Sequence, residues 1–135
     1  MKKLSFICCL LLALSFSTSC MDSNSNIEVK LITADEMKSI IDLEDVQLVD
    51  VRTPEEHDEI RIANSQNIDY SSPTFEEDID KLDKEKPVIL YCKGGNRSAK
   101  CAKKLKDAGF EKIYELEGGI SKWKHSDKIK IEAKS

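Results

Sequence analysis

The residues best suited to chemistry lie in one short stretch, YCKGGNRS, which covers residues 91–98. A continuous apolar run ends at Cys92, and basic, glycine and polar residues follow it. These following residues are Lys93, Gly94, Gly95, Asn96, Arg97 and Ser98. Glycines allow a loop to turn its N–H groups inward, and successive inward N–H groups form an anion-binding site. The pattern predicts that Cys92 is a nucleophile whose thiol pKa is lowered.

Two further features of this loop favour the thiolate form of Cys92. A helix is predicted to begin at Ser98, and its positive end would face the thiol. Lys93 and Arg97 add two formal positive charges. The alternative is that the cysteine is a small buried apolar residue and the glycine-rich segment is an ordinary turn. A basic residue on each side of the glycines favours the nucleophile, and the same loop would hold an anionic substrate beside it.

Cys101 is the second cysteine of the predicted domain. It lies three residues after Ser98 and four before Leu105, so the three residues share one face of the predicted helix. This spacing predicts a buried core residue. The alternative is a resolving thiol that forms a disulfide with Cys92.

Asp50 and Arg52 follow another predicted strand and are predicted to support the loop. Asp50 would accept N–H groups of a neighbouring loop, and Arg52 would pair with Glu56, four residues further on. His57 and His125 have no partners at the spacing of metal ligands, so no metal site is predicted.

The elements that must position these residues alternate between strand and helix patterns. The predicted strands cover residues 27–33, 46–51, 65–70, 87–92 and, with its turn, 112–119. Two predicted helices start at the capping box TADE (33–36) and at TPEE (53–56), where Pro54 takes a favoured first-turn position. The others cover 73–82 and 98–108, with a short one around Trp123. This order predicts an α/β fold in three layers, α/β/α, around a central, mainly parallel five-stranded sheet. Functional sites in such sheets lie beyond the carboxyl ends of the strands, where Asp50 and Cys92 fall.

The composition is that of one globular domain. The chain has 135 residues, of which 40% are hydrophobic and 34% charged. A domain of this size buries a sufficient core without disulfides or a metal. The formal net charge is -4, and a negative balance argues against nucleic acid as a partner.

The N-terminal residues 1–19 have the pattern of an export signal. Lys2 and Lys3 precede an apolar stretch from Leu4 to Phe16. This stretch is shorter than the roughly 20 residues that span a bilayer. Removal of the two lysines from the total of -4 would leave the mature chain with a formal charge of -6.

The small residues Ser17, Thr18 and Ser19 before Cys20 resemble a bacterial lipobox, although Ser17 stands where leucine is usual. The resemblance implies that the signal is removed, that Cys20 is lipidated and that the protein is anchored in the periplasm or cell envelope. The alternatives are ordinary signal cleavage and an uncleaved anchor. Residues 20–26 are then predicted to be a polar tether.

Three segments together resemble the rhodanese-like domain family. They are LVDVRTPEEH from Leu48, VILYCKGGNRSAKCAKKLKDAGF from Val88 and IYELEGGISKW from Ile113. Their order and spacing are similar to those of the family, and the loop Cys-x-x-Gly-x-Arg-Ser is the most specific part. The resemblance assigns residues 27–125 to a rhodanese-like domain and leaves 126–135 as a polar tail.

The resemblance implies a sulfurtransferase that works through a persulfide on Cys92. The persulfide would lie among the backbone N–H groups from Lys93 to Ser98, and Lys93 and Arg97 would attract an anionic donor such as thiosulfate. Cyanide or a cellular thiol would then accept the sulfur. No cofactor is implied, and we expect a monomer.

The chain departs from the family pattern after the first of these segments. Family members usually read Gly-His-Ile-Pro-Gly-Ala there, whereas this chain reads EIRIANSQNI, residues 59–68. His57 also stands where an aromatic residue is common. We therefore expect an altered turn in this segment.

The length of the loop separates sulfur transfer from the nearest alternative chemistry. Related phosphatases and arsenate reductases use Cys-x5-Arg, whereas four residues separate Cys92 and Arg97 here. The shorter loop favours a sulfur-bearing guest over a phosphate. Two other hypotheses are a non-catalytic module that binds a partner or carries sulfur, and a thiol redox protein that uses Cys92 and Cys101.

Overall fold

The structure is a computed structural model that describes residues 27–135. The expected signal, Cys20 and tether lie outside the described residues. Within residues 27–135, no helix combines the length and the apolar character needed to cross a membrane.

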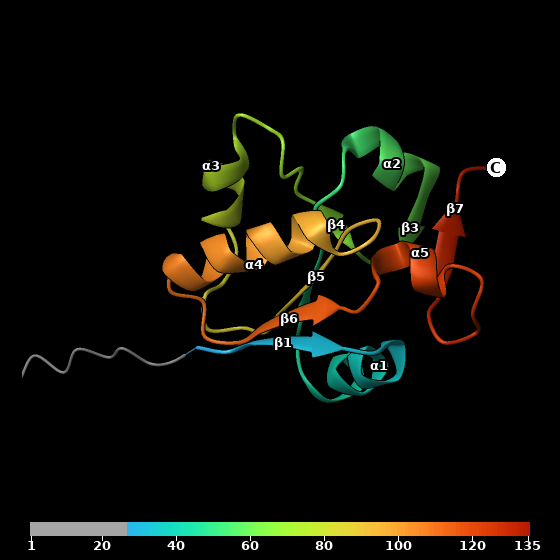
Figure 1. The fold of residues 1–135 in the computed structure, drawn as a ribbon, viewed down its shortest axis with the longest axis horizontal. Helices are drawn as coiled ribbons and strands as arrows, with labels where there is room; N and C mark the ends of the chain where they lie inside the picture. Colours follow the sequence, from blue (N-terminus) through green and yellow to red (C-terminus); the bar gives the residue numbers. More distant parts are fainter. Residues whose placement is uncertain (1–26) are drawn as a thin grey trace, which may run out of the picture.

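The core of the fold is the predicted five-stranded sheet, in the order β1-β6-β5-β2-β4 (Figure 1). Its strands are β1 (Val29–Ile32), β2 (Gln47–Asp50), β4 (Gln66–Asn67), β5 (Val88–Tyr91) and β6 (Ile113–Leu116). All neighbouring strands in it are parallel. Asp50 is paired with Tyr91 in this register, so the ends of β2 and β5 lie side by side.

Five helices surround the sheet, which confirms the predicted α/β class. They are α1 (Ala34–Leu43), α2 (Pro54–Glu59), α3 (Phe75–Ile79), α4 (Asn96–Asp107) and α5 (Gly119–Trp123). Thr33 forms the predicted capping box at the start of α1, and the structure adds a second one, at Thr53, at the start of α2. Helix α4 begins two residues earlier than expected, because Gly95 takes the N-cap position with a φ of 112°.

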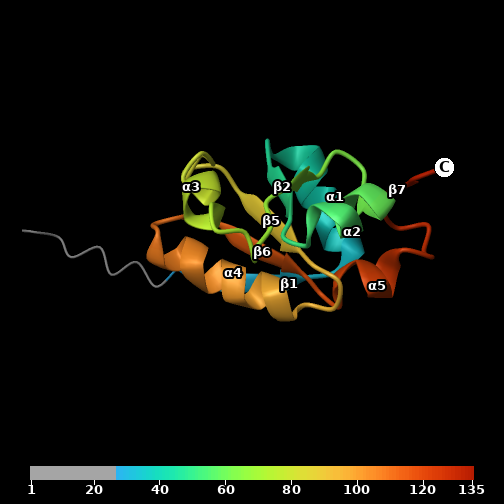
Figure 2. The same ribbon diagram turned by 90° about the horizontal axis from the view of Figure 1, so that it is seen from above.

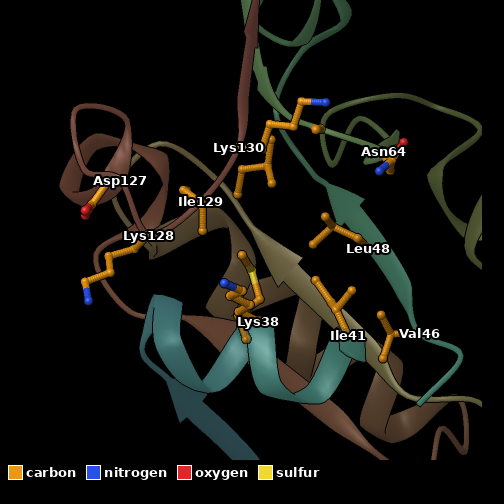
Figure 3. A pocket seen from close by; sticks show the side chains of 12 residues that line it. Lys38, Ile41, Val46, Leu48, Asn64, Asp127, Lys128, Ile129 and Lys130 are labelled. Atoms are coloured by element: carbon orange, nitrogen blue, oxygen red, sulfur yellow. The ribbon is translucent and has the colours of Figure 1, made fainter. Parts of the chain in front are cut away.

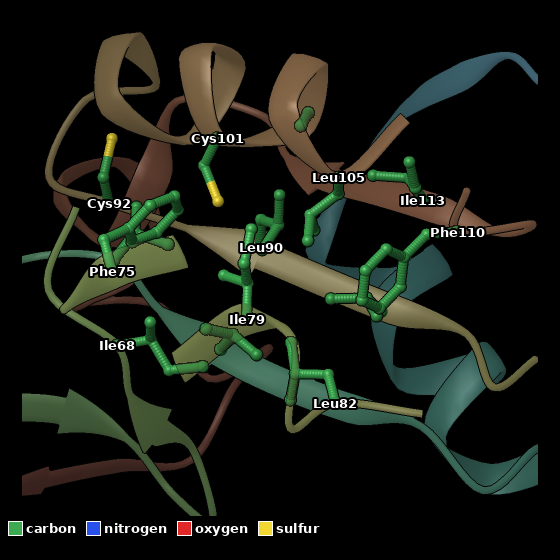
Figure 4. Close-up of a cluster of buried hydrophobic side chains, with 14 residues drawn as sticks. Ile68, Phe75, Ile79, Leu82, Leu90, Cys92, Cys101, Leu105, Phe110 and Ile113 are labelled. Carbon is green, nitrogen blue, oxygen red and sulfur yellow. The ribbon is translucent and has the colours of Figure 1, made fainter. Parts of the chain in front are cut away.

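Helices cover both faces of the sheet, as Figures 1 and 2 show for α4 and α1. One buried cluster joins β5 to α3 and α4, through Leu90, Phe75 and Leu105 (Figure 4). A second cluster lies on the opposite face, where Ile89 packs with Met37 of α1. Because side chains alternate along a strand, every residue of β5 is buried on one face or the other, as predicted for a continuous apolar run.

The expectation of a polar tail over residues 126–135 was wrong. This segment contains β7 (Ile131–Ala133), which pairs antiparallel with β3 (Ile60–Ile62) in a second small sheet. Ile129 is buried, and Ile131 packs against the cluster on the α1 face. The apolar side chains at these alternate positions hold the segment to the domain despite its polar composition.

The chain turns at the end of β3, within the segment where an altered turn is expected. Asn64 has a φ of 63°, a left-handed conformation that asparagine tolerates better than most residues. The preceding Ala63 N–H donates to the Lys130 carbonyl at 2.9 Å, so the turn is joined to the segment before β7.

Candidate active site

Cys92 lies directly after β5, where the sheet fixes its position and the loop folds back over its sulfur. The Gly95 N–H donates to the Cys92 Sγ at 3.0 Å, and the Ser98 Oγ lies 3.6 Å from the same sulfur. The Ser98 Oγ also lies 3.0 Å from the Gly95 carbonyl oxygen and closes the turn, so its single proton serves either this carbonyl or the thiolate. Figure 4 shows the Cys92 sulfur beside the first turn of α4. The loop therefore surrounds the thiol with hydrogen-bond donors.

These donors control the ionisation of Cys92. Burial favours the neutral thiol, but hydrogen bonds from the backbone N–H and hydroxyl of Ser98 and from the N–H groups of Gly95 and Gly94 outweigh it. The pKa of the Cys92 thiol is therefore lower than its ordinary value. The direction is the predicted one, and the principal cause is the hydrogen-bond donors of the loop.

Arg97 is held at the side of the loop by Glu56, the residue predicted to pair with Arg52. Its guanidinium makes two hydrogen bonds to Glu56 of α2, Nη1–Oε2 at 2.6 Å and Nη2–Oε1 at 2.9 Å. This pair lowers the pKa of the Glu56 carboxyl to about 2. The expected pairing of Arg52 with Glu56 was therefore wrong. Lys93 and Asn96 are exposed at the outer edge of the loop.

Arg52 turns into the protein and binds Asp50. Its Nη2 lies 2.6 Å from the Asp50 Oδ2 and 2.5 Å from the Ile60 carbonyl oxygen. The side chains of both members of the pair are almost completely buried. Asp50 accepts the backbone N–H of Arg52 rather than that of a neighbouring loop, which corrects the expectation for Asp50. The pair joins the end of β2 to the start of β3.

His57 joins Asp50 and Arg52 in one group of side chains, the Asp50 cluster. The sequence did not predict this contact of His57. Its Nδ1 lies 2.9 Å from the Asp50 Oδ2. The one signal in the sequence for a special role of His57 was that it stands where an aromatic residue is common in the family. The Arg52 guanidinium lies 5.6 Å from the ring centre of Tyr91, whose side chain faces α1. Cys92 belongs to the core cluster on the α4 face, whereas Tyr91, which Arg52 contacts, belongs to the cluster on the α1 face. The Asp50 cluster therefore lies on the face of the sheet opposite Cys92, where it contacts α2 and β3.

The glycine pair at the start of α5, Gly118 at the N-cap and Gly119 as the first helical residue, anchors the other side of the loop. The Ile120 N–H donates to the Cys92 carbonyl at 2.9 Å, and the Ser121 N–H donates to the Lys93 carbonyl at 3.0 Å. A Cβ on Gly119 would lie 2.5 Å from both of these carbonyl oxygens. Only glycine permits this approach. The segment IYELEGGISKW, from Ile113, therefore holds the backbone of the cysteine loop in place through its glycine pair.

Cys101 has no exposed surface and lies in the core cluster below α4, as predicted (Figure 4). Burial raises the pKa of its thiol to about 12. Cys92 and Cys101 are both free in the described part of the chain. Residues 27–135 contain no group of three or more His, Cys, Asp or Glu side chains that could hold a metal ion.

A model of the rhodanese-like domain matches residues 33–126. The chain belongs to the rhodanese-like domain family. This rhodanese-like domain is 36% identical over 95 residues to the thiosulfate sulfurtransferase GlpE of Coxiella burnetii, a match that covers 70% of the present chain and 87% of GlpE. It is 41% identical over 91 residues to a tRNA uridine(34) hydroxylase of Cytophaga hutchinsonii, covering 65% of this chain and 29% of that protein.

Solved structures agree with the rhodanese-like fold. The crystal structure of a rhodanese-like domain protein from Staphylococcus aureus has a TM-score of 0.66 and 33% identity, and the match covers 79% of this chain and 100% of that one. A rhodanese-related protein from Thermoplasma volcanium has a TM-score of 0.67 and 30% identity, over 78% of this chain and 99% of that one. These matches use almost the whole of each solved chain.

Proposed function

We propose that this rhodanese-like domain is a sulfurtransferase that carries sulfane sulfur as a persulfide on Cys92. The observation that carries the proposal is the Gly95 N–H at 3.0 Å from the Cys92 sulfur, in a loop that lowers the pKa of the thiol. A lowered thiol pKa supplies the thiolate needed for attack on a sulfur donor. The similarity to a thiosulfate sulfurtransferase supports the same reaction class.

The proposed first step is attack of the Cys92 thiolate on the outer sulfur of thiosulfate. A bond forms between the two sulfurs, the sulfur–sulfur bond of thiosulfate breaks, and sulfite leaves with the bonding electron pair. In the second step a nucleophile such as cyanide attacks the terminal sulfur of the persulfide. Thiocyanate leaves and the Cys92 thiolate returns, so the two displacements balance without a cofactor.

The loop would stabilise the charge that remains on sulfur throughout this cycle. The N–H groups of Gly94, Gly95 and Ser98 stabilise the Cys92 thiolate and would serve the terminal sulfur of the persulfide in the same way. Lys93 is exposed and makes no ion pair with another residue in 27–135, so its charge is available to attract an anionic donor. Arg97 is engaged by Glu56 and would mainly hold the shape of the loop.

The direct test is the intact mass of purified residues 21–135 after incubation with thiosulfate. We expect an added mass of about 32 Da that is lost on addition of cyanide, with release of thiocyanate. Cys92→Ser should abolish the adduct, and Cys101→Ser should retain it. Absence of the adduct on the folded wild-type protein, with thiosulfate, mercaptopyruvate and glutathione persulfide as donors, would refute the proposal.

The alternatives predict different products in this experiment. A sulfur carrier without catalytic turnover would form the adduct but release thiocyanate no faster than a free persulfide. A thiol redox protein would form a Cys92–Cys101 disulfide on mild oxidation, which peptide mapping without reduction would detect. The complete burial of Cys101 in the core argues against this second alternative.

A further inference from the structure

A hollow of about 450 Å³ lies between α1 and the small sheet of β3 and β7. Its floor is apolar: Met37, Leu48, Ile62 and Ile129 line it, and their exposed fractions lie between 2% and 8%. Figure 3 shows these walls, with α1 on one side and the segment that leads into β7 on the other. Protein interiors leave few voids larger than a water molecule, and apolar hollows of this size are typical of ligand sites.

The walls of the hollow come from α1, from the region of β2, and from two neighbouring segments, residues 62–64 and 127–130. One wall contains Ile62, Ala63 and Asn64, which lie where the usual family motif is absent. Residues 127–130 form the adjoining part of this wall, since the Ala63 N–H donates to the Lys130 carbonyl at 2.9 Å. These two segments are joined through the pairing of β3 with β7. The hollow is therefore separate from the cysteine loop, because neither Cys92 nor residues 93–98 are among those that line it.

The rim of the hollow carries an excess of positive charge. Lys38 and Lys130 line it, are exposed, and make no ion pair with another described residue. Lys128 also lines the hollow, but its Nζ lies 3.3 Å from the Asp35 Oδ1, and this carboxylate offsets the charge of the lysine. Among the residues that line the hollow, Asp127 is acidic, against the three lysines Lys38, Lys128 and Lys130. This excess occurs on a chain whose formal net charge is -4, so the rim favours an anionic group.

We propose that this hollow binds a small anionic amphiphile, with its apolar chain on the floor and its acidic head group beside Lys38 and Lys130. The volume corresponds to about fifteen water-sized groups at roughly 30 Å³ each, which accommodates a medium-length alkyl carboxylate. The floor belongs to the core cluster on the α1 face, whereas Cys92 belongs to the cluster on the α4 face. The proposal therefore does not depend on the sulfurtransferase activity.

The test uses residues 21–135 and decanoate, below the concentration at which decanoate forms micelles. Calorimetry should give saturable binding of one decanoate per chain. Backbone amide shifts in an NMR titration should change most around Met37, Ile62 and Ile129. Decanol and decyltrimethylammonium have the same chain length without the negative charge, and we expect them to bind about tenfold more weakly.

Charge variants test the role of the rim. The double variant Lys38→Glu with Lys130→Glu should weaken decanoate binding by about tenfold or more. The matched control is Lys100→Glu with Lys103→Glu on the exposed face of α4, which changes the net charge equally and should leave the affinity unchanged. Absence of saturable binding, equal binding of decanol, shifts centred on α4, or equal loss in both double variants would each overturn the proposal.

Discussion

The Glu56 carboxylate and the Arg97 guanidinium form a two-pronged ion pair between α2 and the cysteine loop, with N–O distances of 2.6 Å and 2.9 Å. The same carboxylate accepts the Thr53 N–H at 3.0 Å and so completes the capping box of α2. One side chain thus fixes the start of a helix and the arginine of the loop. This relationship explains how α2 contributes to the site although it holds no residue in contact with the Cys92 sulfur in the structure.

Removal of this carboxylate charge should destabilise the fold in a pH-dependent way. Glu56→Gln should lower the free energy of unfolding by about 1 kcal/mol near neutral pH, because the pair is about one-third exposed. The folded-state pKa of Glu56 is lowered from 4.5 to about 2. Its contribution is therefore complete above the unfolded value and is lost as the pH falls through the folded value.

Urea unfolding of wild type and Glu56→Gln across the acidic range measures this effect. The difference between them should be largest at neutral pH and should shrink as the pH approaches about 2. Glu55→Gln is the matched control, since Glu55 is an exposed neighbour on the same helix. A difference that stays constant down to that pH would show that the ion pair is not its source.

Ser98 should set the ionisation of the nucleophile. Ser98→Ala removes the hydroxyl that lies 3.6 Å from the Cys92 sulfur and closes the loop on Gly95. We expect the pKa of the Cys92 thiol to rise towards its ordinary value, because one of the donors that stabilise the thiolate is lost. The rate of alkylation by iodoacetamide as a function of pH, followed by mass spectrometry, gives the midpoint. Cys101→Ser should leave that midpoint unchanged, and an unchanged midpoint in Ser98→Ala would contradict the assignment.

Gly119 should be irreplaceable because of its neighbours as well as its backbone conformation. Gly119→Ala would place a Cβ 2.5 Å from the carbonyl oxygens of Cys92 and Lys93, at a φ of +60°. We expect a loss of about 3 kcal/mol in unfolding free energy and a large loss of sulfur transfer. Gly109→Ala is the control, since Gly109 has a φ of +91° and nothing within 4 Å of its Cβ position.

Gly109→Ala should cost only the left-handed conformation, about 1 kcal/mol, and leave sulfur transfer intact. Chemical unfolding and the thiosulfate assay compare the two variants directly. Equal destabilisation of both would mean that the contact of Gly119 with the cysteine loop has no energetic role.

Much of the site could be predicted from sequence because its signals are local. A continuous apolar run identified β5, and glycines followed by a basic residue identified the loop after Cys92. The helix spacing of Cys101 placed it correctly in the core. The capping box at Thr33 and the first-turn proline Pro54 located two helix starts, because each of these signals lies within the first turn of its helix.

The errors concern contacts that depend on tertiary structure. Arg52 was paired with Glu56 by helix spacing, but α2 starts at Pro54, so Arg52 lies outside the helix in which that spacing applies. The contact between His57 and Asp50 joins a helix to the end of a strand. The β3–β7 pair joins two strands of three residues each, separated by most of the domain. No local pattern specifies such a partner.

Export and lipid attachment remain proposals that a single substitution tests. We propose that Cys20 carries a lipid after removal of residues 1–19, on the lipobox-like residues before it. In a bacterial host, the wild-type chain should fractionate with membranes and incorporate labelled palmitate, whereas Cys20→Ser should lose the label. Labelling that persists in Cys20→Ser, or a wild-type chain that is never labelled, would refute lipid attachment at this residue.

Asp50 should matter for stability rather than for the ionisation of Cys92. Asp50→Asn leaves the Arg52 guanidinium buried without its charge partner, and we expect a loss of about 3 kcal/mol in unfolding free energy. Glu132→Gln breaks the partly exposed pair with Arg61 and should cost less than about 1 kcal/mol. Because the Asp50 cluster lies on the opposite face of the sheet from Cys92, the folded Asp50→Asn variant should retain the wild-type midpoint for alkylation of Cys92. A shifted midpoint in a variant of near-wild-type stability would reverse this assignment and place Asp50 in the electrostatics of the sulfur site.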